Sequence, residues 1–276
     1  MILSCGRFQL NLNRPHVMGI VNVTPDSFSD GGRFNAANTA IAHALKLVDE
    51  GADILDIGGE STRPNAAPVS LQEELDRVIP VISALAQKIN IPISIDTYKP
   101  QVMQAAIAAG ASMVNDVRAL QEHGALEIVA ASDVAVCLMH MQGTPQTMQD
   151  NPYYKNVANE VKAFLADRLQ VSNRAGISAE RILLDPGFGF GKTRAHNIAL
   201  IQKLQSFADL GQPLLVGLSR KSVLGQVTGN DVDARLYASI AAAVIAAMKG
   251  ANILRVHDVK ETVEALKIVA AMEKYE

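Results

Sequence analysis

Ile182-Leu183-Leu184-Asp185-Pro186-Gly187-Phe188-Gly189-Phe190-Gly191-Lys192-Thr193 runs from an apolar strand into an acidic residue and then into a glycine-rich loop. A phosphate-binding P-loop reads G-x-x-x-x-G-K-[ST], and this stretch carries proline where that motif opens with glycine. It also lies two-thirds of the way along the chain, whereas such a loop belongs near the first strand of an open sheet. The stretch therefore indicates a strand that delivers a polar residue to a loop, and not a nucleotide-binding site.

The same arrangement of strand, polar residue and loop recurs eight times along the chain. The strands are expected at residues 17–22, 54–58, 91–96, 113–116, 134–141, 182–185, 214–218 and 252–257. A small hairpin, with strands at residues 2–4 and 8–10 and its turn at Gly6, precedes them. An open doubly wound sheet would usually carry a dinucleotide fingerprint after its first strand, and none is present there. The pattern favours an α/β protein, a (βα)8 TIM barrel with a short N-terminal β-hairpin, and we expect residues 1–276 to form a single domain.

Composition excludes several classes of protein. The chain has 276 residues, of which 49% are hydrophobic and 19% charged, so a substantial core is expected and disorder is not. The net charge of -3 gives no basic field for nucleic acid. Cys5 and Cys137 are too few for a disulfide framework, and Cys137 is expected to be a buried thiol. No signal segment or membrane span of ~20 residues is evident, so we expect a cytoplasmic protein without nucleic-acid or membrane partners.

The helix expected at residues 236–248 is almost wholly apolar, with Ser239 its only clearly polar side chain. Such a helix has to be covered on two sides, by the barrel and by something else. We therefore expect a homodimer assembled through this helix.

Polar residues lie at or near the ends of six of the expected strands and share the inward parity of the apolar residues two positions before them. They are Asn22, Asp56, Asp96, Asn115, Asp185 and Arg255. A single strand-end polar residue is as often a helix cap or a loop partner. As a set, three carboxylates, two carboxamides and an arginine are costly to desolvate unless they pair or meet a ligand. Active sites of this fold lie at the C-terminal ends of the strands, so a polar ligand is expected there.

The charged and aromatic residues near this mouth indicate what the ligand carries. Arg63, Arg255 and His257 can hold an anionic part, whereas Lys192 and Lys221, taken singly, are expected to be ordinary solvated lysines. The loop aromatics Phe28, Phe188 and Phe190 can either pack or stack on a planar ring.

Metal chemistry is limited by the histidine spacing. The six histidines form no His-x-His or His-x-x-x-His pair, which argues against zinc, and His140 is expected to be a satisfied barrel residue. Magnesium is easier to accommodate, because it can bind chiefly through a substrate diphosphate with one protein oxygen such as that of Asn22.

Seven segments carry a resemblance to a known family. They are GIVNVTPDSFSDGG at 19–32, DIGGESTRP at 56–64, SIDT at 94–97, ND at 115–116, DPGFGFGK at 185–192, SRKS at 219–222 and RVHD at 255–258. In this order, and after strands one, two, three, four, six, seven and eight, they resemble the bacterial dihydropteroate synthases, a pterin-binding TIM-barrel family. The resemblance covers essentially the whole chain.

The resemblance implies a transferase of folate biosynthesis, inhibited by sulfonamides and dependent on Mg2+. It would join 6-hydroxymethyl-7,8-dihydropterin diphosphate to 4-aminobenzoate, releasing diphosphate and 7,8-dihydropteroate. The pterin site would comprise Asp56, Asp96, Asn115, Met139, Asp185, Gly217, Lys221 and Arg255. The diphosphate site would comprise Asn22, Thr62, Arg63, Ser222, Arg255 and His257, with Asn22 also taking the metal. The aminobenzoate site would comprise Phe28, Thr62, Pro64, Phe190, Ser219 and Lys221. Catalysis would fall to Asp96, Lys221, Arg255 and His257.

Three positions depart from the family pattern, and two other functions share part of it. Asn65 replaces a common glycine, Tyr98 a small residue and Ala238 a frequent glycine. Asparagine tolerates positive φ less freely than glycine, which puts the conformation of the second loop in question. A pterin-binding methyltransferase would share the carboxylate pocket but would not need the loop at 219–222. A non-catalytic pterin-binding barrel would leave the cations at the diphosphate end without a role.

Overall fold

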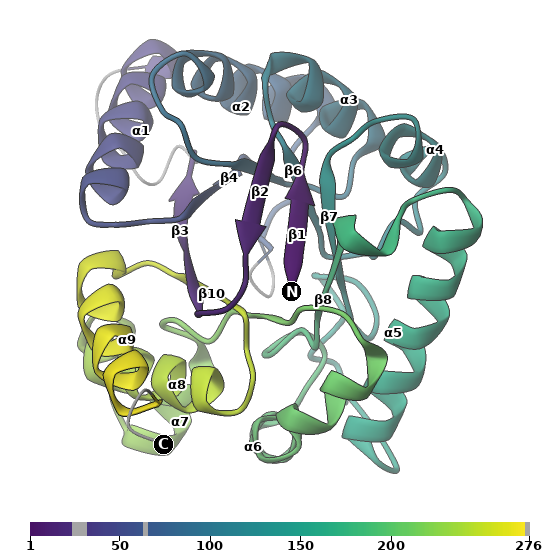
Figure 1. Cartoon of the computed structure of the whole chain (residues 1–276), viewed down its shortest axis with the longest axis vertical. Coiled ribbons are helices and arrows are strands. Elements are labelled where there is room, and N and C mark those ends of the chain that lie inside the picture. Colours follow the sequence, from purple (N-terminus) through teal and green to yellow (C-terminus); the bar gives the residue numbers. More distant parts are fainter. Residues whose placement is uncertain (24–31, 63–65, 274–276) are drawn as a thin grey trace.

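A parallel eight-stranded barrel forms the centre of the computed structural model, which describes residues 1–23, 32–62 and 66–273. The strands are β3 (His16–Asn22), β4 (Ile54–Gly58), β5 (Ile93–Asp96), β6 (Met113–Asp116), β7 (Ala135–Met139), β8 (Ile182–Asp185), β9 (Leu215–Val216) and β10 (Ile253–Val256). They pair in the order β8-β7-β6-β5-β4-β3-β10-β9. A bridge between Leu184 and Leu214 links the two ends of this order, so the predicted barrel is confirmed (Figure 1). The strand expected at 214–218 is only two residues long.

The helices form an outer ring around the strands (Figure 1). They are α1 (Gly32–Asp49), α2 (Leu71–Ala86), α3 (Pro100–Ala109), α4 (Ala125–Ala130), α5 (Val157–Arg174), α6 (Arg194–Gln202), α7 (Ser222–Thr228), α8 (Leu236–Met248) and α9 (Val259–Glu273). Short 3-10 helices occupy Ala179–Arg181, Leu204–Leu210 and Val232–Ala234. Local sequence sets several starts: Pro100 opens α3, and the Ser70 hydroxyl accepts from the Glu73 amide at 3.2 Å at the start of α2.

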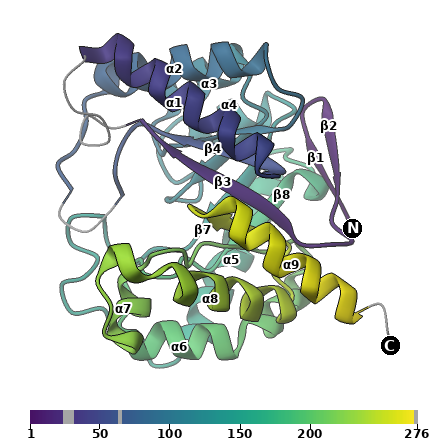
Figure 2. The ribbon, with the colours of Figure 1, turned by 90° about the vertical axis from the view of Figure 1, so that its left-hand side faces the viewer.

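The N-terminal hairpin closes one end of the barrel. Its strands, β1 (Ile2–Cys5) and β2 (Phe8–Asn11), are antiparallel and turn at Gly6 with a φ of 56°, as predicted. Leu3 and Cys5 are fully buried and pack on the lowest inward layer of the barrel. That layer includes Met18, Ile54, Met113, Cys137, Leu183 and Ile253. Figure 2 shows the hairpin at the end where the strands begin, so a ligand has access from the opposite end.

Inward parity continues from this apolar layer to the polar residues two positions later. Ile54, Met113, Leu183 and Ile253 all belong to the inner cluster, and the residues two positions after them are Asp56, Asn115, Asp185 and Arg255. A second, larger core lies between the outward faces of the strands and the helices. No helix within the described ranges is long and apolar enough to cross a membrane.

Candidate active site

Four polar residues from four strands meet inside the C-terminal end of the barrel. Arg255 on β10 donates from Nε to Asp56 Oδ2 and from an NH2 group to Asp96 Oδ2, both at 2.6 Å. Asn115 on β6 donates from Nδ2 to the same Asp56 oxygen at 3.0 Å. The period of two along each strand brings these groups together, as the sequence pattern predicted. The result is one guanidinium shared by two carboxylates.

Each of these carboxylates keeps one oxygen without a partner. Among the residues that the structure describes, neither Asp56 Oδ1 nor Asp96 Oδ1 has a hydrogen bond, although both atoms are buried. Burial raises the pKa of Asp96 to about 7, against the opposing effect of Arg255. Buried acceptors are nearly always satisfied in proteins, so this pair of oxygens favours a ligand that presents N–H groups.

Asp185 ends β8 where the glycine-rich loop begins. Its Oδ1 accepts from the Gly187 amide at 2.7 Å, and burial raises the pKa of the carboxyl while that bond opposes the rise. Gly187 has a φ of 70°, and an added Cβ would lie 1.9 Å from the His140 carbonyl oxygen, so only glycine fits. Phe188 in this loop is only 1% exposed. Of the two roles considered for it, core packing and stacking on a planar ring, its burial favours core packing.

Lys221 reaches this loop from the end of the seventh strand segment. Its Nζ donates to the Phe188 carbonyl at 2.5 Å and lies 3.9 Å from the centre of the Phe190 ring. Burial lowers the pKa of this ammonium to about 7. The expectation of an ordinary solvated lysine is therefore wrong for Lys221.

Two small or flexible residues border the same space. Met139 on β7 is the register partner of Asp185 and is buried. Gly217 lies beside Arg255. A Cβ added at Gly217 would lie 3.7 Å from the Cβ of Arg255. That distance is an ordinary van der Waals contact, so the glycine leaves this part of the wall without a side chain but is not required by a clash.

The remaining predicted residues lie around the rim. Ser219 Oγ and His257 Nδ1 are 3.0 Å apart, and the His257 amide donates to the same hydroxyl at 3.2 Å. Asn22 ends β3 and Ser222 opens α7, and both are exposed, while Thr62 is half-buried in the connection after β4. Phe28, Arg63, Pro64 and Asn65 lie outside the residues that the structure describes.

Sequence reasoning missed two positions that shape the site. Arg220 has a left-handed φ of 57° and forms a two-point ion pair with Asp258, at 2.5 and 3.1 Å, while its amide donates to Ser239 at 2.9 Å. Lys192, expected to be solvated, is only 3% exposed, so that expectation is also wrong. Arg220 stood between two predicted site residues in the SRKS segment, and Lys192 ended the opening stretch, but no sequence signal marked either as buried or strained.

Comparison with known proteins places this geometry in a family. Residues 18–257 match the family described as pterin binding enzyme. Dihydropteroate synthase of Escherichia coli strain K12 is 54% identical over 262 residues, which cover 95% of this chain and 93% of that protein. The Yersinia pestis dihydropteroate synthase with a sulfonamide drug has a TM-score of 0.95 at 52% identity, covering 99% of this chain and 100% of that one. The Xanthomonas albilineans enzyme in complex with 7,8-dihydropteroate has a TM-score of 0.91 at 49% identity, covering 99% of each chain.

A carboxylate-lined mouth on a (βα)8 barrel, together with the family match, defines a pterin-binding barrel enzyme. Within that class, the chain belongs to the dihydropteroate synthase family. It is a transferase of folate biosynthesis that condenses 6-hydroxymethyl-7,8-dihydropterin diphosphate with 4-aminobenzoate, giving 7,8-dihydropteroate and diphosphate.

Proposed function

We propose that the mouth of the barrel divides this reaction among three adjoining subsites, of which the pterin pocket is the deepest. The pocket is formed by Asp56, Asp96, Asn115, Met139, Asp185, Gly217, Lys221 and Arg255. The observation that carries this proposal is the pair of buried carboxylate oxygens, on Asp56 and Asp96, that lack partners among the described residues. A pterin edge carries adjacent N–H groups, which are the donors that such oxygens require.

The diphosphate occupies the rim next to this pocket. The residues assigned to it are Asn22, Thr62, Arg63, Ser222, Arg255 and His257. Ser219 and His257 are mutually bonded, which supports a fixed orientation for the imidazole. An aromatic amine with a para carboxylate is a weak nucleophile, so we infer that catalysis depends mainly on stabilising the departing diphosphate with charges already in position. Asp96 and Lys221 hold the pterin, and Arg255 and His257 face the leaving group.

Mg2+ fits the same rim. Asn22 offers an exposed amide oxygen at the end of β3, and an ion bound chiefly through a diphosphate needs only one or two protein oxygens. When bound, it supplies positive charge to the diphosphate. An Asn22→Ala variant should therefore bind Mg2+ together with diphosphate more weakly than the unaltered protein does in calorimetry, while its affinity for a dihydropterin alone stays unchanged.

The 4-aminobenzoate subsite is assigned to Phe28, Thr62, Pro64, Phe190, Ser219 and Lys221. The contact between Lys221 and the Phe190 ring supports it, because it joins a cation and an aromatic face at the edge of the pterin pocket. The Yersinia pestis relative binds a sulfonamide drug. We propose that the aminobenzoate subsite of this chain also accepts sulfonamides.

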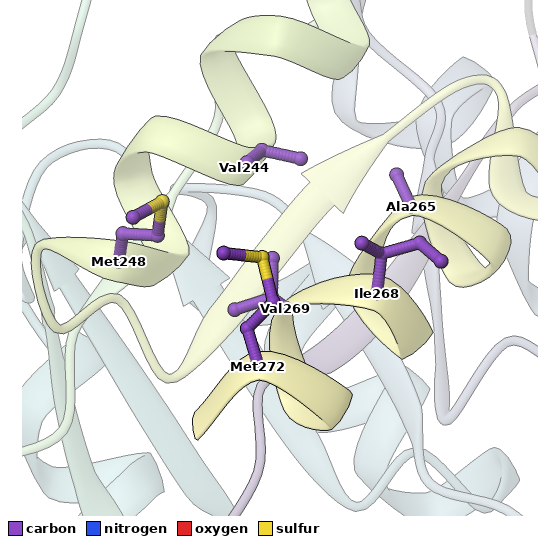
Figure 3. A pocket seen from close by; sticks show the side chains of 6 residues that line it. All are labelled: Val244, Met248, Ala265, Ile268, Val269 and Met272. Atoms are coloured by element: carbon purple, nitrogen blue, oxygen red, sulfur yellow. The ribbon is translucent and has the colours of Figure 1, made fainter. Parts of the chain in front are cut away.

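The outward face of α8 supports a homodimer. Tyr237, Ile245 and Met248 on this helix are 82, 46 and 64% exposed. An apolar groove of about 390 Å³ separates α8 from α9 and is lined by Val244, Met248, Ala265, Ile268, Val269 and Met272, as Figure 3 shows. A second apolar groove, of about 290 Å³, lies between α6, α7 and α8 and includes Ala238, one of the family departures. Two apolar hollows beside an apolar helix are typical of an interface. The proposed cell location is the cytoplasm.

Replacing one pocket carboxylate tests the pterin assignment. We expect Asp185→Asn to weaken dihydropterin binding by about 1.5 to 3 kcal/mol, because an amide cannot replace a charge-assisted bond. Isothermal titration calorimetry would measure it, with Asp209→Asn as the control because Asp209 is an exposed aspartate that pairs with Lys162. Unchanged affinity in Asp185→Asn would remove this residue from the pocket.

A further inference from the structure

A buried lysine lies behind the pterin pocket, outside the set of residues assigned to any subsite. Lys192 follows the glycine-rich loop after β8 and is 3% exposed. Its Nζ lies 2.9 Å from three acceptors: the Gly187 carbonyl, the Phe190 carbonyl and His140 Nδ1. The His140 carbonyl is a fourth, longer neighbour at 3.3 Å. The ammonium therefore joins two points of the loop to the end of β7.

The neighbours of the Lys192 Nζ are all hydrogen-bond acceptors, although burial lowers the pKa of this amino group well below its ordinary value. An ammonium has three hydrogens to donate, and three acceptors stand at the same short distance. No carboxylate of residues 1–23, 32–62 or 66–273 forms an ion pair with it. Burial lowers the pKa of His140 to about 3, so its imidazole stays neutral, and its Nδ1 accepts from Lys192 when the ring proton is on Nε2. The Lys192 amino group is thus held by neutral acceptors alone.

The loop held in this way is the one that orients two pocket groups. Its Gly187 amide donates to Asp185, and its Phe188 carbonyl accepts from Lys221. Gly187 and Gly191 are both left-handed, and added Cβ atoms would lie 1.9 Å from the His140 and 2.6 Å from the Gln142 carbonyl oxygens. The loop is therefore held against the segment that follows β7. Lys192 bonds to both, and Gln149 and Tyr154 add hydrogen bonds from that segment to the Gly189 and Gly191 carbonyls.

We infer that Lys192 is a positioning residue of the pterin pocket: by tying the Gly187 and Phe190 carbonyls to His140, it fixes the loop geometry on which Asp185 and Lys221 depend. This inference rests on the proposed assignment of Asp185 and Lys221 to the pterin. Lys192 does not touch the substrate and acts through the loop. A merely structural lysine would affect folding stability without affecting pterin affinity in the folded protein.

A double-mutant cycle with calorimetry separates these two roles. The variants are Lys192→Met, which keeps length but removes all donors, Asp185→Asn, and the two combined, titrated with 6-hydroxymethyl-7,8-dihydropterin at a temperature where circular dichroism shows each folded. We expect Lys192→Met alone to weaken binding roughly tenfold or more, and by less than about threefold in the Asp185→Asn background, because coupled residues are not additive. Lys162→Met, which replaces a lysine on the surface of α5, is the control and should stay within about twofold.

Each outcome decides the matter. A folded Lys192→Met that binds the dihydropterin within about twofold of the unaltered protein, or effects that simply add in the cycle, would overturn the inference. Should Lys192→Met fail to fold, Lys192→Gln takes its place in the cycle, since its shorter side chain offers two N–H donors to three acceptors. We expect it to weaken binding in the otherwise unaltered protein but not in the Asp185→Asn background, and effects that simply add would overturn the inference. Failure of the unaltered protein to bind, or normal binding by Asp185→Asn, would instead count against the proposed pterin pocket.

Discussion

At the scale of single residues, Arg255 sets the charge balance of the pocket. One guanidinium faces two carboxylates, so the cluster of Arg255, Asp56 and Asp96 carries a net negative charge when both acids are ionised. Burial makes that state unfavourable and raises the pKa of Asp96 to about 7. Because a protonated carboxyl loses a charge-assisted bond to a ligand N–H, the affinity of the pocket should depend on pH near neutrality.

The protonation of Asp96 should make the affinity for a dihydropterin fall as the pH is lowered, which gives the acid limb of the pH profile. As pH falls through about 7, Asp96 takes up a proton, and the dissociation constant for a dihydropterin should rise by up to about tenfold per pH unit. Asp96→Asn should bind more weakly than the unaltered protein at pH 8, where Asp96 is ionised, and should lose this limb, so that the two calorimetric curves approach each other towards pH 5.5. Lys221 loses its proton above about pH 7 in the unaltered protein, and Asp96 raises that pKa, so both proteins are also titrated in a Lys221→Met background to isolate the limb due to Asp96. Parallel curves for the two proteins would exclude Asp96 as the titrating group.

Prediction of single residues from the sequence succeeded where the alternation of side chains along a strand decides which way each side chain points. The period of two placed Asp56, Asn115 and Arg255 inside the barrel end, where the structure has them bonded to one another. It failed for Lys192 and Lys221, because lysine is normally solvated and only the tertiary contacts of the loop reveal that both ammonium groups are enclosed. The left-handed conformation of Arg220 was equally hidden, since nothing local to an arginine favours it.

At the scale of elements, a buried ion cluster fastens the connection after β4 to the starts of α2 and α3. Lys99 donates to Glu60 and Glu74 carboxylates, both at 2.5 Å, and to the Val69 carbonyl at 2.9 Å. Tyr98 lies beside the cluster, with its ring 5.2 Å from the Lys99 ammonium. Tyr98, one of the three departures from the family pattern, therefore packs against this ion cluster. The Lys99 ammonium therefore holds Glu60 and Val69, which flank the segment that contains Thr62.

Removing that ammonium should destabilise the fold strongly. Glu74 is fully buried, so Lys99→Met leaves its charge uncompensated, at a cost of about 3 to 5 kcal/mol in the free energy of unfolding. Urea denaturation at fixed protein concentration would measure the change, and Lys99→Met combined with Glu74→Gln should recover part of it. Lys88→Met, at an exposed lysine just after α2, should change stability by less than about 0.5 kcal/mol. A loss under about 1 kcal/mol for Lys99→Met would contradict the argument.

Element boundaries followed the sequence where local chemistry fixes them. Pro100 and Ser70 set helix starts, and β4, β6 and β8 have the predicted ends. The strand at 214–218 was overestimated, because Gly217 and Leu218 leave the ladder once β9 has paired with β10. α5 begins at Val157, after Asn156, whose side chain accepts from the Asn159 amide at 3.1 Å.

At the scale of the whole molecule, the hairpin covers one end of the barrel and the polar site lies at the other, so the ring of helices is the remaining surface for association (Figures 1 and 2). Apolar composition predicted that α8 needs a second covering but could not tell which of its faces is free. Ala243 and Ala246 turn out to pack against the protein, whereas Tyr237, Ile245 and Met248 face outward. A charge at Ala243 would therefore disturb the core and would not test an interface.

Ile245→Glu is the variant that tests the homodimer. A stable interface removes about 800 Å² per partner from water, and a glutamate at an outward position of α8, beside an apolar groove, would have to be desolvated on association. We expect the unaltered protein to sediment as a dimer at micromolar concentration and Ile245→Glu as a monomer, with the circular dichroism of the folded state retained. Ile2→Glu, at an exposed isoleucine on β1, should remain dimeric.

Because association stabilises the folded state by mass action, the melting temperature of the unaltered protein should also rise with concentration, while that of Ile245→Glu should not. A monomeric unaltered protein at micromolar concentration would exclude assembly through α8.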